Sequence, residues 1–300
     1  MAFATTVDAL VERVRRDALL ASRGAVYTLG QAYTAGGTTV TLNETPTHIG
    51  QGSILAIGYE LFYVVSVSAG TKQVTVIGAF HGSTAADHDA GAIVEVDARF
   101  PKAALIDYAE QEIRSWGKAL WRVTSADLEV DQGTRTYDLG ITGDIHYVLD
   151  VRVKPVDSDN AWTRDAWVRA QVRLLRGMSV SEFASGVAIQ FTQAPARDTT
   201  VRVTVAQPLD LSPFTSSTDL VTDVGCKAEW LDIVEMGTRY RAMAATVVGR
   251  SDWRTGNMTR SAEEVSTFDV MRATQQAQSM RDVRLAHEAT QLRAEWPYAN

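Results

Sequence analysis

Two histidines and two aspartates lie close together in one turn-rich stretch of the chain: His81, Asp87, His88 and Asp89. Imidazole and carboxylate groups are common metal ligands, so a metal site is one hypothesis for this stretch. However, the spacing fits no standard zinc or calcium loop, and Gly, Ser and Asp are ordinary turn residues. We therefore favour a structural turn and expect no metal.

Other catalytic arrangements have no support in the sequence. His48, His146 and His287 are isolated, and no Ser or Cys lies in a nucleophile-elbow pattern. The single cysteine, Cys226, lies on a helical pattern without a nearby histidine, which is typical of a small core residue. Neither of the common glycine-rich phosphate loops occurs. We expect no catalytic residues, no cofactor and no enzymatic activity.

The composition limits the class of protein. A chain of 300 residues with 45% hydrophobic content can bury a substantial core. Its formal net charge of −7 argues against a broad basic face that holds nucleic acid. The first residues lack the features of a signal peptide, and no stretch approaches the roughly 18 apolar residues of a membrane span. We expect a globular protein without contact to a membrane, assembled in a reducing cytoplasm.

The spacing of apolar residues predicts two amphipathic helices in the first half of the chain. One covers residues 5–21 with a capping start at Thr5, and the other starts at Pro101. Between them, β-branched and aromatic residues predict strands at 61–67, 73–77 and 91–96. Because the two helices could pack together with these strands looped out, we expect the β module to be an insertion.

From residue 127 the apolar spacing changes to two, which predicts strands at 151–154, 187–191 and 201–205. Residues 165–176 are ambiguous. As a strand they place alternate apolar residues on one face, whereas as a helix they align three arginines. We favour a helix because Gly177 is a natural stop. In a homo-oligomer this arginine set could pair with acidic residues of a neighbour; it consists of Arg169, Arg173 and Arg176.

Two further helices are predicted in the last third of the chain. The first covers residues 218–248 and has a broad apolar stripe. The second covers residues 259–295 and has few large apolar residues, so we expect it to lie against a partner chain. The side chains expected at that partner interface are Trp253, Phe268, Met271, Met280 and Trp296.

Together these patterns predict an α+β fold: an α-helical bundle with an inserted small β-barrel-like module, a second β segment and a long C-terminal helix. The predicted organisation is a helical core from residues 1–23 and 100–126, the inserted β module at 24–99, a β-rich segment at 127–209, a bundle helix at 210–250 and a partner-docking helix at 251–300.

Two short motifs in the β module resemble a module of tailed-bacteriophage structural proteins. That module has a "Val-Gly-Asp-Glu"-like turn between two strands, followed by a Gly-Thr-Ala-Ala-x-His-x-x-Gly turn. The matching stretches here are Ile57-Gly-Tyr-Glu60 and Gly82-Ser-Thr-Ala-Ala-Asp-His88-Asp-Ala-Gly91. This chain departs from the pattern at Tyr59, which replaces a small acidic residue, and by an extra serine before Thr84.

The order of elements, with Val205-Ala-Gln-Pro-Leu209 before a long helix, resembles the head-to-tail connector (adaptor) proteins of siphovirus-type tailed phages. The resemblance implies a structural virion protein of the head-tail junction. Such a protein forms a ring, usually of twelve copies, that sits below the portal protein, continues the DNA channel and carries the next neck or tail protein. The resemblance also implies that a C-terminal segment docks on the portal. The acidic charge favours DNA passing through without specific binding.

Two alternative functions stay open. A tail-tip or other tail-associated phage protein could contain the same β module, but we would then expect more β-rich repeats and fewer helices after residue 210. A phage-encoded hydrolase would need acid, base or metal ligands gathered in one pocket, and the sequence shows no such cluster.

Overall fold

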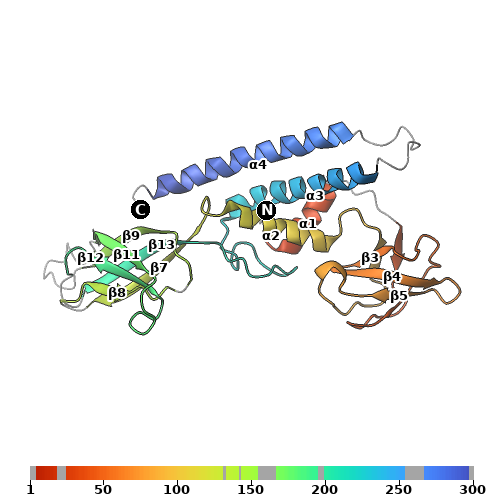
Figure 1. The fold of residues 1–300 in the computed structure, drawn as a ribbon, viewed down its shortest axis with the longest axis horizontal. Coiled ribbons are helices and arrows are strands. Elements are labelled where there is room, and N and C mark those ends of the chain that lie inside the picture. The colour runs from red at the N-terminus through yellow and green to blue at the C-terminus, as the bar shows by residue number, and fades with distance from the viewer. Residues whose placement is uncertain are drawn as a thin grey trace. The chain divides into compact units, whose positions relative to one another are not determined.

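The structure, a computed structural model, describes residues 5–18, 25–130, 133–141, 143–154, 167–194, 199–253 and 267–296. These residues form thirteen β-strands and four α-helices, shown in chain order by the colours of Figure 1. The chain divides into two compact units. The first consists of Met1–Ser115 and Leu211–Asp282, and the second of Trp116–Asp210 and Val283–Asn300. Each unit is therefore built from two separate stretches of chain.

The first unit contains a six-stranded antiparallel sheet in the order β1-β6-β3-β4-β5-β2. Its two edge strands approach each other at an isolated bridge between Leu29 and Leu42, so the sheet curls into a half-barrel around an apolar core. The strands predicted at 61–67, 73–77 and 91–96 are confirmed. The six strands are β1 (Val26–Thr28), β2 (Thr39–Thr41), β3 (Ile54–Ile57), β4 (Glu60–Ser68), β5 (Gln73–Ile77) and β6 (Ile93–Val96).

Helices make up the rest of the first unit. Pro101 directly precedes the first residue of α2, as predicted, and its carbonyl accepts the N–H of Leu105. The N-cap of α1 is Thr6 and not Thr5: the Thr6 hydroxyl accepts the N–H of Ala9. The helices are α1 (Val7–Arg13), which continues as the π-helical turn Val14–Ala18, α2 (Lys102–Trp116), α3 (Leu231–Trp253), preceded by the 3-10 turn Ala228–Trp230, and α4 (Thr267–Glu295). The last residues of α2 and α4 belong to the second unit.

The predicted helix start at residue 218 is wrong, because the chain forms a turn there. The carboxylate of Asp219 accepts the N–H groups of Val221 and Thr222 at 2.8 and 2.9 Å. The carboxylate of Asp223 accepts the N–H of Asp219 at 2.8 Å. Such bonds from side chain to backbone compete with helical hydrogen bonds. Gly225 then adopts a φ of +85°, which is outside the helical region, and α3 begins only at Leu231.

The second unit contains two antiparallel sheets that share one hydrophobic core. Alternate residues of the central strand β13, Val201, Val203 and Val205, point into this core. The strands predicted at 151–154, 187–191 and 201–205 are confirmed. One sheet consists of β10 (Val168–Arg169), β9 (Tyr147–Lys154), β13 (Thr199–Gln207) and β7 (Arg122–Val130), and the other of β11 (Val172–Arg176), β12 (Val187–Phe191) and β8 (Thr136–Asp138).

The predicted helix over residues 165–176 is also wrong: from residue 168 this stretch forms the strands β10 and β11. Val172 and Leu174 pack against the core, and Leu174 lies opposite Ile189 of β12. A strand buries these alternate residues on one face, whereas a helix would turn one of them towards solvent. The burial of this apolar alternation therefore outweighs the stop signal at Gly177.

The predicted fold class, based on an α-helical bundle, is contradicted. The described residues form thirteen strands and four α-helices, and the antiparallel sheets provide two of the cores. The prediction treated residues 127–209 as one accessory β segment. In the structure this stretch provides most of two sheets that bury apolar residues between them.

The turn at Asp219 gives a stability prediction. Asp219→Ala removes the acceptor for Val221 and Thr222 and for the hydroxyl of Thr5. We expect the free energy of unfolding to fall by about 1–2 kcal/mol at neutral pH, because the bonds are made to a charged group that is only partly buried. These hydrogen bonds, that from Thr5 first, lower the pKa of Asp219. The stabilisation is therefore present above the unfolded-state pKa of about 3.9 and is lost as the pH falls through the lower folded-state value.

Chemical denaturation at neutral pH and at about pH 2 checks this expectation, since a carboxyl is mostly protonated at the lower pH. The difference between Asp219→Ala and the wild type should shrink in acid. The exposed Asp144→Ala serves as the matched control and should change little at either pH. An equal loss for Asp219→Ala at both pH values would contradict the assigned role of the carboxylate.

Candidate functional site

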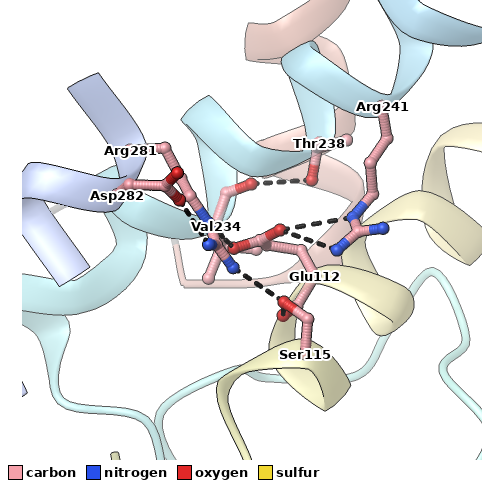
Figure 2. A network of polar contacts seen from close by, with 7 residues as sticks. All are labelled: Glu112, Ser115, Val234, Thr238, Arg241, Arg281 and Asp282. Carbon is pink, nitrogen blue, oxygen red and sulfur yellow. Dashed lines mark hydrogen bonds and ion pairs between the residues drawn. The ribbon is translucent and has the colours of Figure 1, made fainter. Parts of the chain in front are cut away.

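Three helices of the first unit meet at the side chain of Glu112, which lies on α2 and is fully buried (Figure 2). One carboxylate oxygen, Oε2, accepts two N–H groups of Arg241 on α3, both at 3.2 Å. The other oxygen, Oε1, accepts the Nε–H of Arg281 on α4 at 2.6 Å. An ionised carboxylate is costly to bury without such partners. Glu112 therefore requires at least one arginine beside it.

Gly237 on α3 provides the space for this carboxylate. A Cβ atom at position 237 would lie 2.1 Å from Cδ and 2.4 Å from Oε2 of Glu112. Any side chain other than hydrogen would therefore displace the carboxylate from α3. Glycine inside a helix costs about 0.5–1 kcal/mol relative to alanine. A glycine is nevertheless needed here, because the Glu112 carboxylate lies directly against α3. We call the recess formed by Glu112, Ser115 and Gly237 the Glu112 notch.

Arg281 uses all three of its guanidinium nitrogens at the notch. Nε donates to Glu112, Nη2 donates to the hydroxyl of Ser115 at 2.7 Å, and Nη1 donates to the adjacent Asp282 at 2.7 Å. The Ser115 hydroxyl in turn donates to the Glu112 carbonyl at 2.6 Å. Burial alone would lower the pKa of Arg281, but the hydrogen bonds to Asp282 and Glu112 outweigh it and raise that pKa. Arg281 thus stays charged when it is docked.

The face of α4 that packs against the protein combines polar and apolar residues, and Leu292 near its end is 1% exposed. Thr274 and Glu288 are buried and Arg281 lies midway between them, so the three residues recur at a seven-residue spacing on one side of the helix. Three other large apolar side chains remain in solvent: Met271, Met280 and Val283 are 45%, 57% and 70% exposed. At the notch itself, Arg281 is held by hydrogen bonds and an ion pair.

A second buried carboxylate, Glu60, organises the turn-rich stretch of the half-barrel. Its Oε2 lies 3.0 Å from Nε2 of His88 and accepts the N–H of Ala86 at 3.0 Å, while Oε1 accepts the N–H of Ala79 at 3.1 Å. The backbone also lies close to this carboxylate: a Cβ atom at Gly78 would lie 2.7 Å from Oε1 of Glu60. Glu60, the last residue of the first phage-like motif, and His88, within the second, thus bind each other and close the stretch onto β4.

The other residues that were considered as metal ligands, His81, Asp87 and Asp89, each have different contacts. Asp87 accepts the N–H of Ala35 at 2.8 Å, and His81 is exposed with its ring against Phe80. Asp89 accepts the N–H of Ala92 through its carbonyl. Among the described residues, no group of three or more His, Cys, Asp or Glu side chains is placed to hold a metal ion. The arrangement is that of a hydrogen-bonded turn.

Tyr59, where the chain departs from the phage-like pattern, connects the half-barrel to α1. Its hydroxyl donates to the carboxylate of Asp8, and burial followed by this hydrogen bond raises the pKa of Tyr59. Close by, a cavity of about 860 Å³ is lined by the half-barrel, by α1 and the turn after it, and by the first residue of α2. Two ion pairs lie in its wall, Arg15 with Glu95 at 2.6 Å and Lys102 with Glu12. The described residues that line the cavity show no catalytic arrangement of acid, base and nucleophile.

Cys226 is not a reactive thiol. It is buried, and burial raises the pKa of its thiol to about 12. The thiolate, which is the nucleophilic form, is therefore almost absent at neutral pH.

The residues predicted at a partner interface are described only in part. Met271 and Met280 are exposed but lie on different sides of α4, because nine helical residues correspond to two and a half turns. Trp296 follows α4 and is partly buried. The side chains of Trp253 and Phe268 lie outside the described residues. The predicted arginine row is also divided: Arg169 lies on β10 beside Asp150, while Arg173 and Arg176 lie on β11, in the other sheet.

The sequence analysis missed Glu112 and Gly237, although both gave a signal. Glu112 lies seven residues after Leu105 and four before Trp116, so it interrupts the apolar stripe predicted for α2. A charged residue on an apolar stripe requires a buried partner. Gly237 lies inside a predicted helix, where glycine is unfavourable unless another group approaches closely. The partners themselves lie on helices far along the chain, and spacing alone does not identify them.

No protein family model matches this chain, and no curated protein matches it. In the described part of the chain, no helix combines the length and apolar character needed to cross a membrane.

The notch predicts that Gly237→Ala destabilises the protein. In an ordinary exposed helix this change gains about 1 kcal/mol from helix propensity. Here the new methyl group occupies the place of the Glu112 carboxylate and separates it from Arg241. We expect a net loss of about 2–3 kcal/mol in the free energy of unfolding, measured by calorimetry. Gly70→Ala, at an open position, is the control. Unchanged or higher stability for Gly237→Ala would show that the notch does not exist.

The half-barrel predicts a cost for Glu60→Gln. The change keeps the size of the side chain but places an amide NH₂ against a backbone N–H, because Ala79 and Ala86 donate to different oxygens. We expect a loss of about 1–3 kcal/mol, the cost of a buried unsatisfied donor. Glu182→Gln, at an exposed position, should be neutral. Thermal unfolding of the two variants side by side checks the difference, and equal midpoints would refute the structural role of Glu60.

Proposed function

We propose that this chain is a structural virion protein of a tailed, siphovirus-type phage, located at the head-tail junction. Copies form a ring, usually of twelve subunits in the proteins it resembles, that joins the portal to the tail and continues the DNA channel. The observation that carries the proposal is the bond between Glu60 and His88. These residues belong to the two phage-like motifs, and their contact supports a resemblance of folded modules rather than of isolated sequence fragments.

The elements after residue 210 support a connector over a tail-tip protein. In the described residues that follow this point, the regular elements are α3, α4 and a short 3-10 turn, and β13 ends at Gln207. A tail-tip protein was expected to continue with β-rich repeats. The described side chains also give no support to a hydrolase, because neither the cavity nor the turn stretch gathers catalytic groups.

The outer side of α4 supports the expected contact with the portal. Met280 and Val283 lie next to each other on this side and are more than half exposed. Exposed aliphatic side chains on a helix that is otherwise polar are suited to a partner that buries them. The acidic charge of the chain in turn favours a channel wall that repels the DNA backbone, so that DNA passes without specific binding.

Electron microscopy of the purified full-length chain, alone and with the portal protein encoded in the same genome, tests the proposal. We expect rings, and we expect them to bind the portal. The double change Met280→Asp and Val283→Asp should abolish portal binding, because it places charges in an apolar contact. Gln276→Asp, also exposed on α4, is the matched control and should bind normally. A chain that stays monomeric in the presence of the portal would contradict the proposal.

A further inference from the structure

We propose that the open edge of β7 is a docking site for an extended segment of another protein. The segment adds one strand beside β7 in the four-stranded sheet, and the side chains that it places next to Asp127 and Glu129 are basic. This inference goes beyond the proposed ring and does not depend on it. Four features of the edge carry it: its length, the direction of its backbone groups, the partly open core beside it and its charge.

β7 is the longest edge strand of the described sheets. It pairs with β13 over nine consecutive residues without a bulge, and no described strand lies on its other side. Nine residues correspond to about 30 Å, whereas the other edge strands have five residues or fewer. Natural sheets commonly protect an edge with proline, lysine, a bulge or a very short strand, and β7 has none of these features.

A hydrogen bond at the end of β13 shows which residues of β7 face the open edge. The carbonyl of Ala206 on β13 accepts the N–H of His146, which directly precedes β9, at 2.8 Å. Because backbone direction alternates along a strand, the neighbouring Val205 faces β7, and its partner Thr124 faces β13. The N–H and C=O groups of every second residue of β7 therefore point to the open edge: Val123, Ser125, Asp127 and Glu129. None of these groups has a hydrogen-bond partner among the residues that the structure describes.

The hydrophobic core beside this edge is incompletely covered. Ala126 and Leu128, on the inner face of β7, pack against the core of the second unit but remain partly exposed. Val201 and Val203 of the neighbouring β13 are fully buried. A strand added beside β7 covers Ala126 and Leu128 in the way that β7 covers β13. The edge therefore offers apolar contact in addition to hydrogen bonds.

Two carboxylates on the outer face of β7 select the kind of strand. Asp127 and Glu129 are both exposed, and Asp127 is bound to Arg202 of β13 at 2.7 Å. Glu129 has no ion pair with any described residue. Side chains directly opposite each other on neighbouring strands lie about 5 Å apart, where opposite charges attract and like charges repel. A basic side chain beside Glu129 is therefore favoured, whereas a second β7, which adds the same two carboxylates to this face, is disfavoured.

Two synthetic peptides as long as β7 test the docking site on the full-length chain. One alternates lysine with valine, and the other alternates glutamate with valine. We expect the lysine peptide to bind and to slow hydrogen exchange at the amides of Ser125 and Asp127, measured residue by residue by NMR. The amide of Thr124, which faces β13, should not change. The glutamate peptide should bind at least about tenfold more weakly, and added salt should reduce this difference.

Ser125→Pro tests the backbone contact. Proline removes an N–H that faces the open edge and leaves the bonds to β13 in place, so the protein should fold but bind the lysine peptide about tenfold more weakly. Ser125→Ala is the matched control, because it also removes the hydroxyl that lies 3.0 Å from that of Thr204 but keeps the N–H. It should bind as the wild type does.

Glu129→Lys tests the charge and decides the question if Ser125→Pro does not fold. This change should reverse the preference, so that the glutamate peptide binds more tightly than the lysine peptide. Glu182→Lys, at an exposed position outside β7, is the control and should keep the original preference.

Three results would overturn the inference. Equal binding of the two peptides would refute the selection by charge. Binding of the lysine peptide without protection of the Ser125 and Asp127 amides would place it at another surface. Protection of the same amides in the chain alone, increasing with protein concentration, would identify a second copy as the occupant. None of these measurements involves the portal, so the docking site and the proposed location stand or fall separately.

Discussion

The burial of the Glu112 carboxylate is the constraint on which the arrangement of α2, α3 and α4 depends. An ionised group that is fully removed from water must be surrounded by donors, and here these donors come from two other helices. The requirement determines the neighbouring residues one by one. Gly237 leaves space for the carboxylate, and Arg241 and Arg281 compensate its negative charge. The hydroxyl of Ser115 accepts a hydrogen bond from Arg281. The order in which these residues occur in the chain plays no part in this requirement.

The two buried carboxylates of the first unit differ in what donates to them. Glu60 accepts two backbone N–H groups in addition to the contact with His88, and backbone groups cannot leave without unfolding the turn. Glu112 accepts hydrogen bonds from the guanidinium groups of Arg241 and Arg281, which lie at the ends of long, flexible side chains. The bonds of Glu60 therefore fix the backbone of a turn, whereas those of Glu112 join side chains of separate helices.

The proposed role in assembly agrees with where this protein places its apolar residues. The half-barrel and the two-sheet unit each bury a cluster of apolar residues in a core. Helix α4 leaves Met271, Met280 and Val283 in solvent and turns Thr274, Glu288 and Leu292 inward. The exposed apolar side chains of this helix are available to the partner that we propose. In a ring, such a contact is repeated at every subunit, which makes weak single contacts sufficient.

Local patterns in the sequence determined six of the thirteen described strands and the start of α2, because alternation of Val201, Val203 and Val205, or proline before a helix, acts within a few residues. Patterns also showed that α4 cannot bury a wide apolar face. Tertiary structure decided what local patterns could not. It decided that residues 168–176 form strands and not a helix, and that α3 begins only after the Asp219 turn. It also decided that antiparallel sheets, and not a helical bundle, form the basis of the fold. It also decided that Glu112 meets Arg241 and Arg281. The physical reason is that a buried charge specifies the kind of partner it needs, while only the packed fold selects which residue supplies it.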